Sequence, residues 1–158
     1  MADAQPAKAA PVQLVPVTRQ NYVQVFDLEV APEQKQFVAD TAFSLVQAAY
    51  EPNWEPRAIV ANGNVVGFLM GGIIEPGVYE ISRLLVDRAY QGKGYGRAGL
   101  TLFLEQLDKR PDVEIVKTSY IPSNLHAQEF YGAFGFINTE ERWQDEIVMA
   151  RTPHRRGA

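Results

Sequence analysis

Three glycines within five residues, at positions 92, 94 and 96, constrain the fold of this chain more than any other feature. They follow an apolar stretch over residues 78–86 that predicts a β-strand. They precede a helical pattern that places Leu100, Phe103, Leu104 and Leu107 on one face. Successive glycines let main-chain N–H groups approach an anion closely, and the helix start adds a partial positive charge there. This unit is therefore predicted to hold a diphosphate, with Lys93 and Arg97 adding formal charge nearby.

Two other interpretations of the loop deserve comparison. Residues 94–99 match the dinucleotide pattern G-x-G-x-x-G, but Gly94 lies eight residues after Val86, whereas that motif follows its strand almost at once. Only 59 residues follow Gly99, too few to complete a doubly wound sheet. The loop alone also fits a flexible glycine turn that binds nothing, and the glycines by themselves leave that alternative open.

The N-terminal half predicts a strand, two helices and a hairpin. Residues 12–17 alternate as a strand, and Pro16 places that strand at a sheet edge. Thr18 is placed to cap a helix over residues 18–29, and Pro32 suits the first turn of a second helix. The apolar positions of the second helix lie on one face: Val38, Ala42, Leu45, Val46 and Ala49. Residues 57–61 and 64–70 then predict a hairpin on the turn Asn62-Gly63.

The C-terminal half continues with alternating element types. Pro76-Gly77 predicts a turn before the strand 78–86, and residues 114–119 predict another strand after the glycine-rich unit. A short helix over 124–134 and a hairpin of 136–142 with 146–150 complete the pattern. The order β-α-α-β-β-β-α-β-α-β-β predicts one α/β (α+β) domain with a mostly antiparallel sheet.

Composition limits the alternatives further. A chain of 158 residues, 46% hydrophobic and 22% charged, fits one domain over residues 12–151, with a disordered lead at 1–11 and a flexible tail at 152–158. It has no cysteine, which excludes disulfides and thiolate metal sites and suits a reducing cytoplasm. The net charge of −4 disfavours nucleic-acid binding, and the longest apolar run is far below the ~20 residues of a membrane span. We therefore expect neither a metal, a nucleic acid nor a membrane as partner, and a homodimer is compatible with the sequence.

Two motifs carry a resemblance to a known family. Residues 91–96, Gln-Gly-Lys-Gly-Tyr-Gly, match the Q/R-x-x-G-x-G/A signature of the GNAT superfamily of N-acetyltransferases. Residues 124–136 resemble its second signature, N-x-x-A-x-x-x-Y-x-x-x-G-F, and one helix and one strand separate the two. The resemblance covers nearly the whole chain and implies a mixed, mostly antiparallel sheet of six to seven strands flanked by about four helices. It also implies acetyl transfer from acetyl-CoA to an amine.

The same resemblance implies which residues would bind coenzyme A. The main-chain groups of Leu84, Leu85 and Val86 would pair with the pantetheine arm like an added strand, although these side chains can also be plain core. The diphosphate would lie on the loop formed by Gln91, Gly92, Lys93, Gly94, Tyr95, Gly96 and Arg97. Asn124 would touch the cofactor, or serve only as a helix N-cap.

Catalysis requires two proton transfers, because a primary amine with a pKa of roughly 10.4 must lose a proton and the leaving thiolate must gain one. Glu80 matches the position of the family's general base, and a solvated strand residue is the alternative. Tyr131 matches the family's proton donor, and core packing beside Phe130 and Phe134 is its alternative. The lack of cysteine favours direct attack in a ternary complex over an acetyl-enzyme, although a route through serine stays open.

The acceptor is less constrained. Residues 80–96 look closest to bacterial spermine/spermidine acetyltransferases, so we expect a polyamine or another small amine. A protein N-terminal or lysine acetyltransferase and a non-catalytic acyl-CoA-binding module are the alternatives. Trp54 with Glu51 and Glu55 could hold a cationic amine, although an ordinary surface loop explains them as well.

Overall fold

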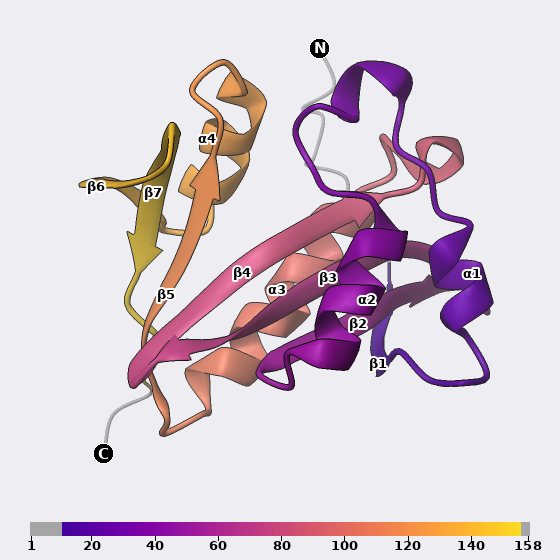
Figure 1. Ribbon diagram of the computed structural model, residues 1–158, viewed down its shortest axis with the longest axis horizontal. Helices are drawn as coiled ribbons and strands as arrows, with labels where there is room; N and C mark the ends of the chain where they lie inside the picture. The colour runs from indigo at the N-terminus through magenta and orange to yellow at the C-terminus, as the bar shows by residue number, and fades with distance from the viewer. Residues whose placement is uncertain (1–10, 156–158) are drawn as a thin grey trace, which may run out of the picture.

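A twisted seven-stranded sheet forms the centre of the protein (Figure 1), and the computed structural model describes residues 11–155. The strands are β1 (Gln13–Pro16), β2 (Trp54–Ala61), β3 (Asn64–Glu75), β4 (Gly77–Val86), β5 (Val113–Tyr120), β6 (Ile137–Trp143) and β7 (Glu146–Arg151). The α-helices are α1 (Tyr22–Phe26), α2 (Thr41–Tyr50), α3 (Tyr95–Asp108) and α4 (Leu125–Gly132). The element order and the fold class expected from the sequence are confirmed.

The strands lie in the order β1-β2-β3-β4-β5-β7-β6, and every pair is antiparallel except β4 with β5. Strand β1, which ends at Pro16, is an edge strand as predicted. Asn62 and Gly63 both have positive φ, 51° and 77°, which is the backbone of a tight hairpin turn between β2 and β3. The local turn chemistry therefore sets the register of this hairpin.

Strands β4 and β5 separate at one end of the sheet. Their parallel pairing runs only from Gly77 opposite Val113 to Glu80 opposite Lys117. Beyond that point β4 continues to Val86 beside β3, while β5 turns away with β6, β7 and α4 (Figure 1). The split opens at the carboxyl ends of both strands, next to the glycine-rich loop.

A β-bulge at Ser82 changes which side chains of β4 share a face. Arg83 pairs with Met70 and Ile81 pairs with Gly71, so Ser82 is an additional residue in the ladder. Without it, Glu80 and Arg83 would point to opposite faces, because side chains alternate along a strand. The bulge places both side chains on the face of the sheet that α2 covers.

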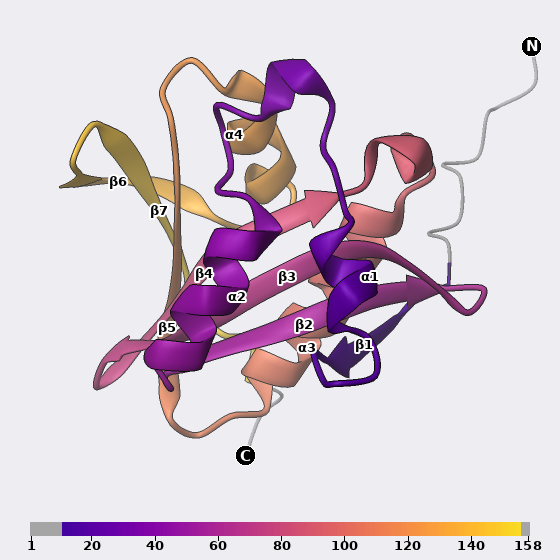
Figure 2. The ribbon, with the colours of Figure 1, turned by 45° about the vertical axis from the view of Figure 1, so that its right-hand side comes forward.

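Two apolar clusters hold the helices on the sheet. Helix α3 packs on one face through Leu100, Phe103, Leu104 and Leu107, which contact Tyr79 and Ile81 of β4. Helices α1 and α2 cover the other face, where Val25, Leu45 and Ala48 pack against Phe68 and Met70 of β3. Figure 2 shows these two layers on either side of the strands.

The two predicted N-terminal helices are shorter than expected. Helix α1 does not begin at Thr18, because the main-chain N–H of Thr18 donates to Asn21 Oδ1 and Asn21 Nδ2 donates to the carbonyl of Pro16, which forms a closed turn. Pro32 begins only a single 3-10 turn, Pro32–Gln34, which Gln34 closes by accepting from the N–H of Ala31. Helix α2 starts at Thr41 instead, where Asp40 accepts from the N–H of Phe43 as N-cap.

The first part of the expected C-terminal tail contacts the body of the domain. The N–H of His154 donates to Asp108 Oδ1, and the Arg155 guanidinium donates to the carbonyls of Asp108 and Arg110. The expected N-terminal lead falls almost entirely at residues 1–10, which lie outside the described residues, as do residues 156–158.

Candidate active site

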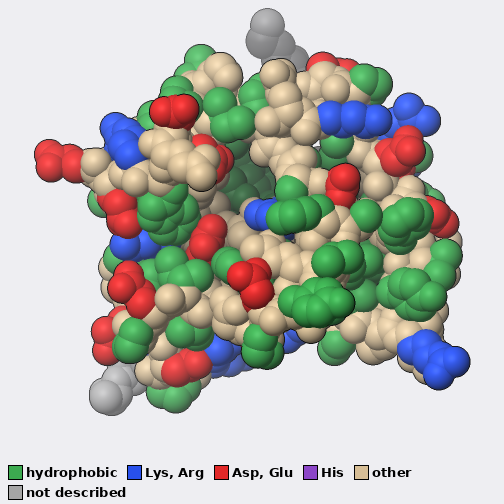
Figure 3. Space-filling model, viewed as in Figure 1, with side chains coloured by type: hydrophobic (Ala, Val, Ile, Leu, Met, Phe, Trp, Pro, Cys, Tyr) green, Lys and Arg blue, Asp and Glu red, His purple; other side chains and the backbone are tan. Residues whose placement is uncertain are grey.

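A cavity of about 620 Å³ fills the split between β4 and β5. Ser82, Leu84, Leu85 and Val86 line it from β4, and Thr118 to Tyr120 line it from β5. Helix α4 and residues 28–40, the segment between α1 and α2, form its other walls, and Figure 1 shows them on opposite sides of the opening. The space-filling view shows the surface hollowed at this place (Figure 3).

The glycine-rich loop forms one end of the cavity. Gly92 and Gly94 have φ of 78° and 81°, a left-handed conformation that side chains disfavour. Gly94 is the N-cap of α3 and gives it no side-chain cap. Among the described residues, no hydrogen bond uses the main-chain N–H groups of residues 92–96. Unpaired N–H groups at a helix start, in open space, are suited to bind phosphate oxygens.

Strand β4 presents a free edge along the same cavity. Its residues 83–86 pair with β3 on one side, and β5 has already turned away on the other. Gln91 Nε2 donates to the carbonyl of Val86, which ties the start of the loop to the end of the strand. An extended amide-containing ligand can pair with such an edge in the way that an added strand does.

Tyr131 projects from α4 into the cavity. Its ring contacts those of Phe130 and Phe136, with centroids 5.4 Å and 5.5 Å apart, both nearly edge-on. Burial raises the pKa of Tyr131 to about 12, and the Thr118 side chain offsets this only in part. The phenol is therefore protonated at neutral pH and available as a proton donor.

Glu80 lies at the point where β4 and β5 separate. Tyr79 and Ile81 point into the core under α3, so Glu80 points to the opposite face. Its neighbour across the ladder, Lys117, is paired with Glu141 at 2.6 Å. Among the described residues Glu80 therefore has no ion pair.

The surroundings of Glu80 favour its neutral form. Burial raises the pKa of Glu80 above its usual range, Arg83 opposes this, and the charge of Glu146 on β7 adds to it. Arg83 is held by α2, since its guanidinium donates to Ser44 Oγ at 3.1 Å and Gln47 Oε1 at 3.2 Å. A half-buried carboxylate with a raised pKa near a cleft is a candidate for a group that exchanges protons during catalysis.

The predicted site residues are brought together with two exceptions. The cavity is lined by Tyr131, Leu84, Leu85, Val86, Gln91, Gly92, Gly94, Tyr95, Gly96, Arg97 and Asn124. Lys93 is exposed and lies over the Tyr90 ring at 5.8 Å, and Glu80 lies beside the cavity rather than in its wall. Asn124 is the N-cap of α4 and accepts from the N–H of Ala127.

Several lining residues were not anticipated. Gln34, Phe37 and Val38 come from the segment between α1 and α2, which was expected to be helix. Gln34 Oε1 accepts from Gln91 Nε2 at 2.8 Å and thereby links that segment to the glycine-rich loop. Thr118 and Ser119 were missed because nothing in a strand sequence indicates that its neighbour has turned away.

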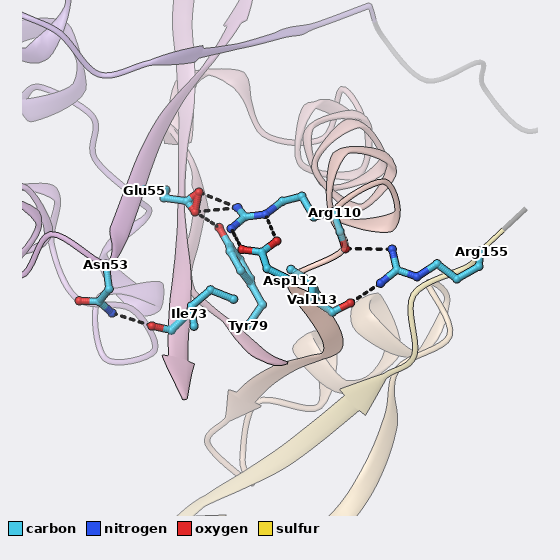
Figure 4. Close-up of polar contacts among 8 residues, drawn as sticks. All are labelled: Asn53, Glu55, Ile73, Tyr79, Arg110, Asp112, Val113 and Arg155. Atoms are coloured by element: carbon cyan, nitrogen blue, oxygen red, sulfur yellow. Dashed lines mark hydrogen bonds and ion pairs between the residues drawn. The ribbon is translucent and has the colours of Figure 1, made fainter. Parts of the chain in front are cut away.

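The group around Trp54 does not form an amine site. Trp54 and Glu55 begin β2 and do not lie in a loop, and the Glu55 carboxylate accepts two hydrogen bonds from Arg110, at 2.7 Å and 2.9 Å. Tyr79 also donates to Glu55, and Asp112 holds the other edge of Arg110 (Figure 4). This network lies at the opposite end of β4 from the cavity and occupies the Glu55 carboxylate, while Glu51 accepts a hydrogen bond from Trp54 Nε1 at 3.1 Å.

The family follows from comparison with known proteins. The model of the acetyltransferase (GNAT) family matches residues 22–136. The chain belongs to this family. As a GNAT protein it is an N-acetyltransferase, and the resemblance seen in its two motifs is confirmed. None of the helices in the described part of the chain is long and apolar enough to cross a membrane.

Individual relatives agree with this assignment. The spermine/spermidine N(1)-acetyltransferase of Bacillus subtilis strain 168 is 28% identical over 148 residues, which cover 89% of this chain and 97% of that protein. A probable spermine N(1)-acetyltransferase of B. subtilis subsp. natto is equally similar.

Solved structures share the fold at lower identity. An aminoglycoside acetyltransferase in complex with coenzyme A has a TM-score of 0.73 at 21% identity, over 90% of this chain and 95% of that one. The ribosomal-protein-S18-alanine N-acetyltransferase of Escherichia coli has a TM-score of 0.71 at 18% identity, over 93% and 97%. A further aminoglycoside acetyltransferase structure contains acetyl-CoA.

Proposed function

We propose that this GNAT protein transfers the acetyl group of acetyl-CoA to a primary amine of a small molecule, with polyamines as the first acceptor class. The observation that carries the proposal is the split between β4 and β5, where a free strand edge, an uncapped helix start and a protonated tyrosine line one cavity. Each feature matches a different part of the co-substrate: an amide-bearing arm, a diphosphate and a leaving sulfur.

The residues of the cavity fit the co-substrate in the following way. The main-chain N–H groups of residues 92–96 would hold the diphosphate, with Arg97 adding charge at the first turn of α3. The free edge at Leu84 to Val86 would align the pantetheine arm along β4. Asn124, whose side chain lines the cavity as the cap of α4, would contact the same arm. Acetyl-CoA supplies the acetyl group activated as a thioester.

The two proton transfers are assigned to Glu80 and Tyr131. Glu80 would accept the proton of the acceptor ammonium through a water molecule, since its carboxylate lies beside the cavity and not in its wall. The free amine then attacks the thioester carbonyl directly, and the carbon–sulfur bond breaks. Tyr131 would donate its phenolic proton to the departing sulfur. The proton that the attacking nitrogen loses as it becomes an amide would pass to solvent, from which the phenol regains its own.

The charge of the chain and its relatives favour a polyamine as acceptor. The relatives at 28% identity are named for spermine and spermidine. The charge of Glu146 lies close enough to act on Glu80, and the chain carries a net charge of −4. Negative potential attracts cationic acceptors. The cysteine-free chain is also suited to a reducing cytoplasm, where we place the reaction.

A thiol-release assay tests the proposal. Purified protein with acetyl-CoA is offered spermidine, spermine, simple diamines, aminoglycosides and short peptides with free N-termini, and free thiol is followed by colour. The highest kcat/KM is expected with a polyamine. A higher kcat/KM with peptides would show that the acceptor is a protein and not a small amine. The absence of any binding heat when coenzyme A is titrated into the protein by calorimetry would refute the assignment of the cavity.

A further inference from the structure

Helices α1 and α2 expose an unusually apolar outer surface, here called the α1–α2 face. It consists of Tyr22, Val23 and Phe26 on α1 and Phe43, Val46 and Tyr50 on α2. These side chains are between 50% and 84% exposed. They are six of the nine exposed large hydrophobic side chains in the part of the chain that the structure describes. Figure 3 shows hydrophobic side chains gathered where these two helices cover the sheet.

The spacing on α2 explains why the face is continuous along that helix. Positions 43, 46 and 50 lie three and four residues apart and therefore share one side of the helix. The opposite side is already used, because Leu45 and Ala48 pack on the sheet and Ser44 is fully buried. Helix α2 is thus apolar on both sides, a pattern expected of a helix that is covered on both.

Charge points in the same direction. Neither α1 nor α2 contains a charged residue, although the outer side of a solvated helix is normally charged. The nearest charged side chains lie at the border of the α1–α2 face: Asp27 follows α1, and Asp40 and Glu51 flank α2. Arg83 of β4 lies beside Phe43, with its guanidinium carbon 6.0 Å from the centre of that ring. An apolar centre with a polar rim is the usual arrangement of a protein interface.

The area suits a macromolecule rather than a small ligand. Aromatic side chains offer roughly 150–250 Å² each, and four of the six are aromatic; with the two smaller valines, and at least half exposed, the six present roughly 600 Å² of apolar surface. A stable protein interface buries about 800 Å² on each partner, and these side chains supply most of that. Membranes are a poorer match, since interfacial helices carry Lys and Arg on their polar face and these helices carry none.

We infer that the α1–α2 face binds the same face of a second copy of this chain and forms a two-fold symmetric dimer. In such a dimer the same surface of both copies is in contact. A face with a net charge would therefore repel its copy, whereas an uncharged apolar face does not. Helix α2 also holds Arg83 through Ser44 and Gln47. The interface therefore lies on the helix that positions Arg83, whose charge acts on Glu80.

Light scattering of the full-length protein tests this inference. The wild type should have twice the chain mass of 17.7 kDa. The double variant Val23→Glu/Val46→Glu places like charges in the interface and should raise the dimer dissociation constant at least about 100-fold. The matched control is Ile137→Glu, because Ile137 is 69% exposed on β6, away from the α1–α2 face, and this variant should remain dimeric.

If circular dichroism shows that the double variant does not fold, cross-linking tests the dimer interface instead. The chain has no cysteine, so Val46→Cys and Ile137→Cys each introduce a single thiol. A short bismaleimide should join two copies of Val46→Cys and leave Ile137→Cys largely monomeric. A monomeric wild type at all concentrations would overturn the inference, as would a folded double variant that stays dimeric or equal cross-linking at both positions.

Discussion

Replacement of Tyr131 by Phe isolates the proposed proton donor. The substitution removes one hydroxyl and keeps the ring, so the edge-on contacts with Phe130 and Phe136 remain. The fold and the shape of the cavity are therefore expected to be preserved, and the change is confined to the chemistry of the leaving sulfur.

The magnitude follows from the state of the phenol. Burial raises the pKa of Tyr131 to about 12, so at neutral pH nearly every molecule carries the proton to be donated. General acid catalysis by one positioned group contributes about 10²- to 10⁴-fold, which corresponds to about 3 to 5 kcal/mol of activation free energy. We expect kcat to fall by that factor while KM for acetyl-CoA stays within about threefold.

Steady-state thiol release with saturating acceptor measures both constants. Tyr22→Phe is the control, because it removes the same hydroxyl from a tyrosine that is 50% exposed on α1 and should leave kcat unchanged. A kcat of Tyr131→Phe equal to that of the wild type would remove Tyr131 as the proton donor. A raised KM with unchanged kcat would assign it to binding alone. A wild-type kcat that falls between pH 8 and 10 and loses this fall in the variant would contradict the raised pKa.

Three further predictions concern the base, the cofactor loop and stability. Glu80→Gln should lower kcat about 10²-fold near neutral pH. Burial and the nearby Glu146 carboxylate raise the pKa of Glu80, so the kcat of the wild type should rise with pH at a higher pH than an ordinary glutamate would give. The kcat of the variant should lack this rise. Arg97→Gln should weaken coenzyme A binding, measured by calorimetry, at least about tenfold, as expected for a charge-assisted hydrogen bond. Lys93→Gln should have little effect, because Lys93 is not in the cavity wall. Equal losses of affinity in the two variants would contradict the assignment of Arg97 to the cofactor. Asp108→Ala should reduce the free energy of unfolding in urea by about 3 kcal/mol, since it strips a nearly buried arginine of its partner, against less than about 1 kcal/mol for the exposed partner Asp112→Ala. Burial alone would raise the pKa of Asp108, but hydrogen bonds from that arginine and from the N–H of His154 outweigh it and lower the pKa; this stability is therefore complete above the unfolded pKa of about 3.9 and is lost only as pH falls through the lower folded value.

Local chemistry made much of the fold predictable. The hairpin on Asn62-Gly63 followed from turn residues alone, and the loop at residues 92–96 followed from glycine spacing. Both depend on interactions within a few residues, which a sequence displays directly. The helix boundaries near Thr18 and Pro32 were wrong because side-chain hydrogen bonds of Asn21 and Gln34 close turns there, and periodicity does not register such bonds.

Tertiary effects account for what the sequence did not reveal about the site. Thr118 lines the cavity only because β5 turns away from β4, an event that no residue of β5 announces. Glu146 influences Glu80 from 66 positions away along the chain. Phe37 lines the cavity from a segment whose apolar spacing suggested a helix face. Each of these depends on which segments become neighbours in the folded chain, and the local sequence does not show that.

The divergence of β4 from β5 gives the sheet two further edges, one on each of these strands, in addition to the outer ones at β1 and β6. Unpaired strand edges invite other chains to add to them and are a common origin of aggregation. Here the unpaired part of each strand lies recessed in the cavity between α4 and the 28–40 segment. A slender extended molecule can reach it, whereas the edge strand of another sheet cannot. The same recess thus admits the extended arm of a substrate and prevents strands of other copies of the protein from pairing with the sheet.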